Sequence, residues 1–277
     1  MLITIPERSY VLMSCSPGST GSSSRPSAIA RIASSLNSAH AVTKNVKPLL
    51  ENMAGAGNVI GSTFEDLRDI ISLVDDKSRI GVCLDTCHSF AAGYDLRSKE
   101  AFQATLRKFD EVVGMNYLSA LHLNDSKAPF GSHRDLHQNI GLGFLGLRAF
   151  HNVMTEPRFE GLPMVLETPI DTKDEDGKDI EDKRIWAREI KMLEGLIGMD
   201  AESEEFKAME KELADKGAEE RAKYQDQFER KLGKEKKATE KERKSMADWL
   251  KKGPGNDGGK RKRKRKGEES DGSEKDV

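Results

Sequence analysis

The sequence contains few of the residues that build disulfide frameworks, membrane spans and aromatic-rich cores. Only 3 of its 277 residues are cysteines (Cys15, Cys83 and Cys87), and aromatic residues make up 6%. An odd and small number of cysteines excludes a disulfide framework and favours a reducing compartment. No apolar run reaches the roughly 18 residues of a membrane-spanning helix. The first residues, MLITIPERSYVLMS, lack the pattern of a secretory signal.

Apolar residues are scarce because the last third of the chain has few of them. Hydrophobic residues make up 36% and charged residues 33%, against about 45–50% and about 25% in typical domains. Residues 198–277 hold 23 Lys/Arg and 21 Asp/Glu, which leaves too little apolar surface for a core. We therefore expect a globular part over residues 1–197, a charged helical extension over 198–250 and a disordered tail over 251–277.

In the globular part, short apolar runs alternate with amphipathic segments. The predicted strands cover residues 10–14, 47–51, 80–84, 118–123 and 163–167. The predicted helices cover residues 27–44, 64–74, 98–114, 145–155 and 181–196, with a further helical segment in the charged extension. A repeated strand–loop–helix pattern with continuously apolar strands is typical of parallel βα units, so the predicted fold class is α/β.

Four of these strands end at a residue type that binds metals or transfers protons. The residues are Glu51, Asp85, His122 and Glu167. One carboxylate at such a position is often a helix cap or a loop anion. Four strand ends with the same chemistry instead favour one shared site, because active sites of βα barrels lie at the carboxyl ends of the strands.

Three more candidate ligands lie close to these strand ends in the sequence: His88, Asp135 and His137. Mixed carboxylates and imidazoles suit zinc or manganese better than calcium, which prefers oxygen ligands alone. Sites with several metals can stabilise both the attacking and the leaving oxygen in phosphoryl transfer. The residues therefore predict a metal-dependent hydrolase, but they leave phosphodiester and sugar chemistry open, since barrel sugar isomerases also use carboxylate-rich metal sites.

Five strings of the sequence together resemble one known family. They are LLENMAGAGNVIGS (49–62), GVCLDTCHSFAAGYDL (81–96), LHLNDSKAPFGS (121–132), RDLHQNIGLGFLGL (134–147) and VLETP (165–169). Over about residues 10–197 the chain is similar to the endonuclease IV family of apurinic/apyrimidinic endonucleases. The resemblance implies a TIM (β/α)8 barrel with three zinc ions. It also implies a base-excision-repair enzyme that hydrolyses the phosphodiester 5′ to an abasic site and leaves a 3′-hydroxyl.

The resemblance assigns the seven candidate ligands to metals, position by position. It places Glu51, Asp85, His122 and Glu167 around the second metal, and His88, Asp135 and His137 around the third. Glu51 would also bridge to the first metal. Glu51 and Glu167 would be the catalytic residues that orient or deprotonate the nucleophile, so no side-chain nucleophile is needed.

The sequence also departs from the family pattern. Ser16, in Ser16-Pro17-Gly18-Ser19, stands where the family has a histidine ligand of the first metal. The family's second histidine ligand of the first metal lies on a strand that would precede Met1. About three βα units of the family's barrel likewise have no counterpart in this sequence. We therefore expect an N-terminally incomplete barrel of about five βα units, with two complete zinc sites instead of three. Leu136 stands where the family commonly has an arginine.

Polar and basic residues predict contacts with DNA and an import signal. Asn124, Lys127 and Arg134 are expected to contact DNA. The seven-residue basic run consists of Lys260, Arg261, Lys262, Arg263, Lys264, Arg265 and Lys266. Such a run suits the acidic groove of a nuclear import receptor. The expected compartment is the nucleus, with the mitochondrion as an alternative.

The sequence thus predicts a zinc-dependent endonuclease that acts on double-stranded DNA with abasic sites, as a monomer and without a membrane partner. Two alternatives stay open. One is a metal-dependent sugar isomerase or epimerase-like barrel, which would not need the third-metal residues His88, Asp135 and His137. The other is an inactive, truncated product associated with DNA, which Ser16 favours. Counting bound zinc separates the first alternative, and a nicking assay on an abasic duplex separates the second.

Overall fold

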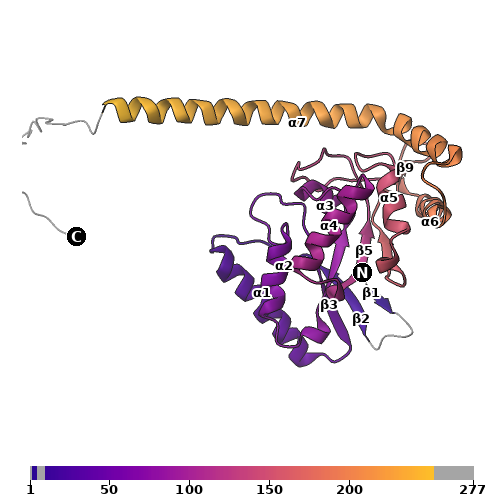
Figure 1. Cartoon of the computed structure of the whole chain (residues 1–277), viewed down its shortest axis with the longest axis horizontal. Helices are drawn as coiled ribbons and strands as arrows, with labels where there is room; N and C mark the ends of the chain where they lie inside the picture. The colour runs from indigo at the N-terminus through magenta and orange to yellow at the C-terminus, as the bar shows by residue number, and fades with distance from the viewer. Residues whose placement is uncertain (1, 5–9, 253–277) are drawn as a thin grey trace, which may run out of the picture. The chain divides into compact units, whose positions relative to one another are not determined.

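The computed structural model of the chain describes residues 2–4 and 10–252 (Figure 1). It contains two compact units, residues 1–230 and 231–277. The basic run at 260–266 lies outside the described residues, so its predicted role stays a prediction. Within the described part of the chain, none of the helices combines the length and apolar character that crossing a membrane requires.

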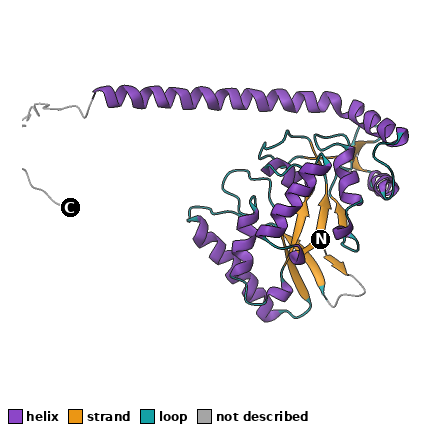
Figure 2. Cartoon of the chain, in the orientation of Figure 1, coloured by secondary structure: helices purple, strands orange, loops and turns teal. Residues whose placement is uncertain are grey.

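The centre of the first unit is a six-stranded sheet (Figure 2). Its strands, in spatial order, are β1 (Leu2–Thr4), β2 (Val11–Cys15), β3 (Val46–Glu51), β4 (Gly81–Asp85), β5 (Leu118–Leu123) and β8 (Met164–Leu166). Within this sheet β2, β3, β4, β5 and β8 run parallel to one another, whereas β1 pairs with β2 in the antiparallel direction. Five parallel strands in this order confirm the predicted βα units.

Helices follow the strands as the pattern predicts. They are α1 (Arg25–Val42), α2 (Phe64–Ser72), α3 (Thr86–Ala92), α4 (Lys99–Val112), α5 (Leu147–Met154), α6 (Arg184–Leu196) and α7 (Glu204–Lys252). Polar caps start several of them. Ser24, Thr63 and Ser98 each accept a backbone N–H from the first turn of α1, α2 and α4, which satisfies donors that the helix itself leaves unpaired.

Helix α3 was not expected, because its residues were predicted to form a loop. Asp85, the last residue of β4, caps the helix by accepting the backbone N–H of His88 at 2.7 Å. Gly93 ends it with a φ of 101°, a conformation that glycine adopts without steric cost. The strand therefore runs directly into a short helix, which brings His88 back to the carboxyl end of the sheet.

Two short hairpins lie outside the main sheet. One pairs β6 (Asp125–Ser126) with β7 (His137–Gln138), and the other pairs β9 (Asp171–Lys173) with β10 (Asp179–Glu181). The first hairpin follows β5 closely along the chain. It therefore holds the loop of residues 127–136 at the same end of the sheet as the predicted site.

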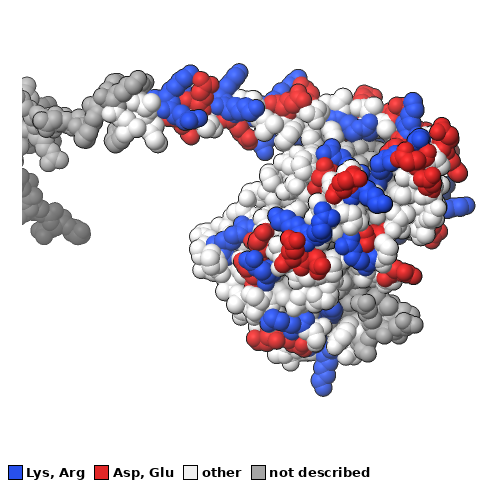
Figure 3. Space-filling view, in the orientation of Figure 1, with Lys and Arg blue, Asp and Glu red and all other residues white. Residues whose placement is uncertain are grey.

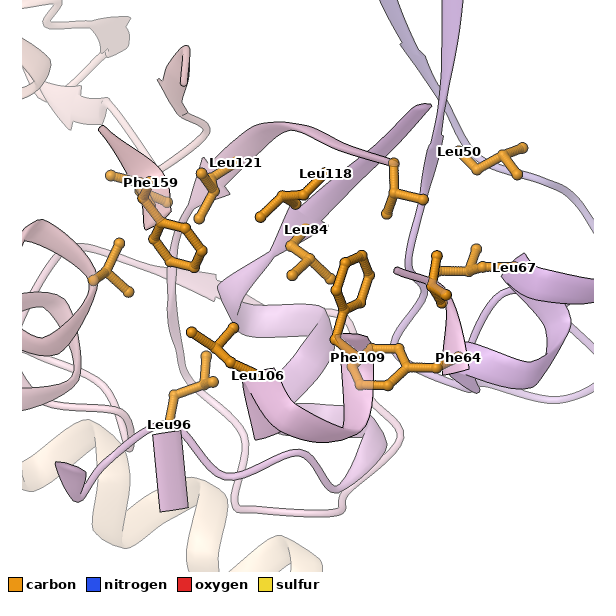
Figure 4. Packing of buried hydrophobic residues seen from close by; sticks show 14 of the residues in the cluster. Leu50, Phe64, Leu67, Leu84, Leu96, Leu106, Phe109, Leu118, Leu121 and Phe159 are labelled. Atoms are coloured by element: carbon orange, nitrogen blue, oxygen red, sulfur yellow. The ribbon is translucent and has the colours of Figure 1, made fainter. Parts of the chain in front are cut away.

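Large apolar side chains fill the space between the sheet and its helices (Figure 4). Phe64 of α2 meets Phe109 of α4 edge to face, with ring centroids 5.2 Å apart. Leu84 and Leu121 reach this layer from the strands. Burying one such side chain stabilises the fold by about 1.5–3 kcal/mol. The core therefore fixes the strands whose ends carry the candidate ligands.

The first compact unit continues past the predicted boundary at residue 197 to Arg230. Phe206, near the start of α7, is fully buried and meets the ring of His151 with centroids 5.1 Å apart. Arg148 of α5 donates to both carboxylate oxygens of Glu210, at 3.0 and 3.1 Å. Acidic and basic side chains are mixed along α7 (Figure 3), but the start of this helix belongs to the core.

Candidate metal centre

Four candidate ligands meet at the carboxyl end of the parallel strands. Glu51 and Asp85 are the last residues of β3 and β4, His122 lies near the end of β5, and Glu167 follows β8. Asp85 and His122 stand opposite each other in the strand register. Each of the four offers a ligand atom, and these atoms all lie within 4.8 Å of one another. We call these residues cluster A.

Cluster A extends from the protein interior to the surface. The Nδ1 atom of His122 lies 3.2 Å from an oxygen of Glu51 and 3.2 Å from an oxygen of Glu167. Glu51, Asp85 and His122 are buried, whereas the side chain of Glu167 is 38% exposed. A molecule from solvent can therefore reach the cluster from the side of Glu167.

A second group of ligands, cluster B, lies beside the first and contains His88, Asp135 and His137. The Nε2 atoms of His88 and His137 each lie 3.1 Å from the same oxygen of Asp135. The three residues come from α3, from the loop of the first hairpin and from β7. Half of the Asp135 side chain is exposed, so this cluster also opens to solvent.

The two histidines of cluster B are oriented as metal ligands. The Nδ1 atom of His88 lies 2.9 Å from the carbonyl oxygen of Asn52, and that of His137 lies 3.1 Å from the carbonyl oxygen of Glu167. A carbonyl can only accept, so each Nδ1 is the donor. Each buried Nε2 atom faces the Asp135 carboxylate at 3.1 Å, without a hydrogen bond of good geometry among the described residues. When a carbonyl fixes Nδ1–H, Nε2 is left as the ligand atom, as in metal-binding histidines.

Asp85 connects the two clusters. Its carboxylate is fully buried, and its oxygens lie 3.9 Å from His88 Nδ1 and 3.9 Å from His137 Nε2. Cys87 can form a further group with Asp85 and His137. Burial raises the pKa of the Cys87 thiol, which opposes its ionisation to a ligand. The described residues thus offer two adjacent positions where a divalent metal fits the donor set.

The charges of the clusters depend on one another. Burial alone would raise the pKa of Glu51, but His122 and His88 outweigh it and lower that pKa to about 2. Burial would lower the pKa of His88, but the nearby carboxylates, chiefly Asp85, raise it to about 11. Without a metal, Glu51 is therefore ionised beside a protonated His88, whereas burial raises the pKa of the Asp85 carboxyl. A bound cation would replace the protons of the histidines.

The expectation that Asn124 contacts DNA is wrong, because its side chain is fully buried. Its Nδ2 donates to an oxygen of Asp85 at 2.6 Å, and its Oδ1 accepts the backbone N–H of Glu167 at 3.0 Å. Through these two hydrogen bonds, Asn124 orients the Asp85 carboxylate and fixes the backbone at Glu167. Lys127 and Arg134, the other two predicted DNA contacts, are partly exposed on the loop beside cluster B.

Asn52 also positions the site, although the sequence reasoning did not single it out. Its Oδ1 accepts the backbone N–H of Asp85 at 2.7 Å, and its Nδ2 donates to Ser89 Oγ at 3.1 Å. Its own carbonyl holds His88, as described above. One asparagine thus ties the ends of β3 and β4 to α3. Its place directly after Glu51 was the available signal.

Asp125 is a second residue whose role the sequence reasoning missed. It is fully buried, and its two oxygens accept five backbone N–H groups, from Ser126, Gly141, Gly143, Leu145 and Gly146. Burial raises the pKa of its carboxyl to about 6, against the lowering effect of these donors. Asp125 therefore fixes the glycine-rich loop that follows His137. The glycines in the sequence indicate a tight loop after His137, but they do not indicate that Asp125 binds its backbone.

The position of Ser16 agrees with the absence of a histidine there. Ser16 is exposed, and the neighbouring Ser14 donates to the second oxygen of Glu51 at 3.2 Å. Among the described residues, the candidate ligand groups include His88, His122 and His137 but no fourth histidine. Beside this oxygen of Glu51, the described residues thus offer the Ser14 hydroxyl and no further histidine of a candidate ligand group.

Residues 8–196 match the family model described as xylose isomerase-like TIM barrel. The chain belongs to this family. The position of the candidate centre at the carboxyl ends of the strands agrees with membership, because that end carries the active site in TIM barrels.

The chain is also similar to curated proteins whose names are more specific than the family description. The chain is 43% identical over 218 residues to apurinic-apyrimidinic endonuclease 1 of Schizosaccharomyces pombe, covering 79% of this chain and 61% of the relative. It is 48% identical over 165 residues to the protein of the same name from Saccharomyces cerevisiae, covering 60% and 45%. It is 48% identical over 186 residues to probable endonuclease 4 of Chlorobium luteolum, covering 67% and 62%. The chain thus spans about half to three fifths of these relatives.

A solved structure supports the same comparison. The crystal structure of endonuclease IV from Thermus thermophilus matches with a TM-score of 0.53 and 28% sequence identity. The match covers 67% of this chain and 61% of the other chain. The predicted resemblance to the endonuclease IV family is therefore confirmed by sequence and by structure.

Proposed function

We propose that this chain is a zinc-dependent endonuclease that hydrolyses the DNA phosphodiester 5′ to an abasic site. The observation that carries the proposal is the pair of clusters A and B, which share Asp85 as a neighbour at one end of the barrel strands. The names of the relatives, apurinic-apyrimidinic endonuclease and endonuclease 4, support this substrate. The mixed carboxylate and imidazole donors support zinc over calcium.

Two carboxylates of cluster A are suited to handle the proton of the attacking water. Glu51 is buried with its pKa lowered to about 2, and Glu167 is partly exposed with its pKa lowered, chiefly by the hydrogen bond with His122. Both are therefore ionised at neutral pH and able to accept or orient a proton. Glu167 is the one that solvent reaches, so we assign it the direct contact with the attacking water.

The remaining residues hold the substrate and the metals. Cluster A and cluster B would each hold a zinc ion, which supplies positive charge to the phosphate oxygens when bound. Asn52, Asn124 and Asp125 keep the ligands in place through the hydrogen bonds described above. Lys127 and Arg134 would bind phosphates next to the lesion, where charge fixes position but not sequence.

The test is cleavage of a synthetic duplex that carries one abasic-site analogue. We expect the zinc-loaded chain to cut 5′ to the lesion and to leave a 3′-hydroxyl, and Glu167→Gln to abolish the cut without loss of bound zinc in cluster B. Elemental analysis of the same samples should give up to two zinc ions per chain. If the wild-type chain binds zinc but leaves the abasic duplex uncut, the proposal is wrong.

A sugar isomerase or epimerase-like activity is the alternative that the family name keeps in view. Cluster B favours the nuclease, because a barrel sugar isomerase would not need His88, Asp135 and His137. Isomerisation of simple ketoses by the zinc- or manganese-loaded chain would support the alternative.

For the compartment, we propose nuclear import through residues 260–266. A fluorescent fusion in which Ala replaces these residues should become cytoplasmic, and exclusive nuclear retention would contradict the proposal.

A further inference from the structure

Helix α7 lies against the glycine-rich loop that follows β7, and it also contacts the hairpin loop of residues 127–136, which carries the proposed DNA contacts. Gly217 faces the carbonyl of Leu142 so closely that a Cβ there would lie 1.9 Å from that oxygen. Arg221 donates to the same carbonyl oxygen at 2.7 Å. One turn earlier, Leu213 packs on Gly141. These contacts are all within the first compact unit, and they dock the helix on the glycine-rich loop that follows β7.

The next turns of α7 contact basic side chains of the hairpin loop of residues 127–136. The ammonium of Lys127 lies 4.0 Å from a carboxylate oxygen of Glu220. Glu220 also accepts a hydrogen bond from Gln138, which is next to the candidate ligand His137. Both proposed phosphate-binding side chains of the loop have a partner on α7, because Arg134 contacts it as well.

Arg134 is held by an aromatic ring and an amide. Its guanidinium lies 5.5 Å from the ring centroid of Tyr224, and it donates to Gln227 at 3.4 Å. A cation over an aromatic face gains about 0.5–1 kcal/mol at exposed sites. Such weak contacts can be exchanged for phosphate, which binds arginine through charge-assisted hydrogen bonds.

The docked segment offers anionic groups to the basic side chains. Residues 217–227 hold three Asp/Glu and two Lys/Arg. Acidic side chains therefore slightly outnumber basic ones in the segment that contacts Lys127 and Arg134. The carboxylate of Glu220 presents to Lys127 the same kind of anionic oxygen that a phosphate has.

We propose that residues 217–227 of α7 compete with the DNA backbone for Lys127 and Arg134, so that DNA must displace this segment in order to bind. The proposal rests on the function proposed above, since it takes these two side chains as the phosphate contacts. It adds an intramolecular competitor to the nuclease. The helix lowers the affinity for any duplex, whether or not the duplex contains a lesion, because it blocks backbone contacts and not base contacts.

The experiment compares the variant Glu220→Gln/Tyr224→Ala with Glu212→Gln. Glu212 is exposed on the same helix and pairs with Lys216 at 2.6 Å, away from the loop. Each protein is titrated with an undamaged, fluorescently labelled duplex at several salt concentrations. We expect the double variant to bind about tenfold more tightly than the control at low salt. The slope of log K against log[salt] should steepen by about one to two, at about 0.9 per phosphate neutralised.

Three further proteins keep the result decisive. Lys127→Ala/Arg134→Ala should weaken duplex binding, and it should remove the gain when combined with Glu220→Gln/Tyr224→Ala. Gly217→Ala should tighten binding through loss of docking without a change of charge. Equal affinity of Glu220→Gln/Tyr224→Ala and Glu212→Gln would overturn the competition, and so would unchanged binding by Lys127→Ala/Arg134→Ala. Nicking of the abasic duplex by the same samples tests the enzyme activity separately.

Discussion

Replacing Gly217 by alanine tests how closely α7 rests on the loop. The change adds one methyl group inside a helix, and on propensity alone it should stabilise the helix by about 0.5–1 kcal/mol. In this structure, however, the new Cβ would lie 1.9 Å from the oxygen and 2.7 Å from the carbon of the Leu142 carbonyl. Backbone atoms cannot turn away as a flexible side chain can, so the helix and the loop must separate.

The expected cost follows from what the separation disturbs. Overpacking of this kind costs typically about 1–3 kcal/mol. The hydrogen bond from Arg221 to Leu142 involves a charged donor, and its loss adds up to about 1.5–3 kcal/mol. Set against a gain of about 0.5–1 kcal/mol in propensity, we expect a net loss of about 1.5–5.5 kcal/mol in the free energy of unfolding. At about 2–4 °C per kcal/mol, the melting temperature falls by about 3–22 °C.

The matched control is Gly233→Ala, at a glycine of the same helix with no atom near its missing Cβ. This variant should keep or raise the melting temperature, because only the gain in propensity remains. Thermal unfolding followed by circular dichroism measures both variants, and hydrogen exchange of residues 137–143 reports whether the loop loosens. If Gly217→Ala is as stable as wild type or more stable, the helix does not rest on Leu142 and the docking argument fails.

Three further outcomes are expected. Zinc affinity should rise with pH by about tenfold per unit for each displaced proton, because the pKa of His88 is raised to about 11. Calorimetry in buffers of different ionisation enthalpy measures the number of protons released on zinc binding. Zinc binding without proton release would contradict this prediction. Asp125→Asn should cost at least about 2 kcal/mol in urea unfolding, since a buried amide cannot accept all five N–H donors; a neutral effect would show that the loop holds itself. Asp66 is held by Arg25 and the Gly61 N–H, which lower its pKa despite burial. Its contribution is therefore complete above the unfolded pKa of about 3.9 and is lost as pH falls through the folded value, so the stability difference from Asp66→Asn should shrink in acid and not at pH 8.

The sequence predicted the strands and the strand-end ligands because both have a local signal. Each buried parallel strand is a continuous apolar run, and each run stops at a ligand type, as at Glu51 and Asp85. Helix α3 had no such signal. Its residues from Thr86 to Ala91 are all buried, so polar and apolar positions show no helical period, and the cap on Asp85 is visible only in three dimensions.

Burial of polar residues was the other limit of the sequence reasoning. Asn124 follows a strand, where a polar residue is as often exposed as covered, and only the long-range bonds to Asp85 and Glu167 decide its role. In the same way, Phe206 stands among charged residues that predict a solvated helix. Its burial depends on a partner, His151, that is distant in the sequence. Such contacts have no period and no motif.

The carboxylate of Asp125 has a consequence for how the loop after β7 can vary among related proteins. It accepts hydrogen bonds only from main-chain N–H groups, so these bonds do not depend on which side chains most of the loop residues carry. Its glycines are the exception: a Cβ on Gly143 would lie 2.3 Å from the carboxylate, and Gly141 and Gly146 have positive φ. An insertion or deletion would in addition shift every donor out of register. A mutational scan that includes insertions and deletions should therefore find the loop's length constrained together with its glycines.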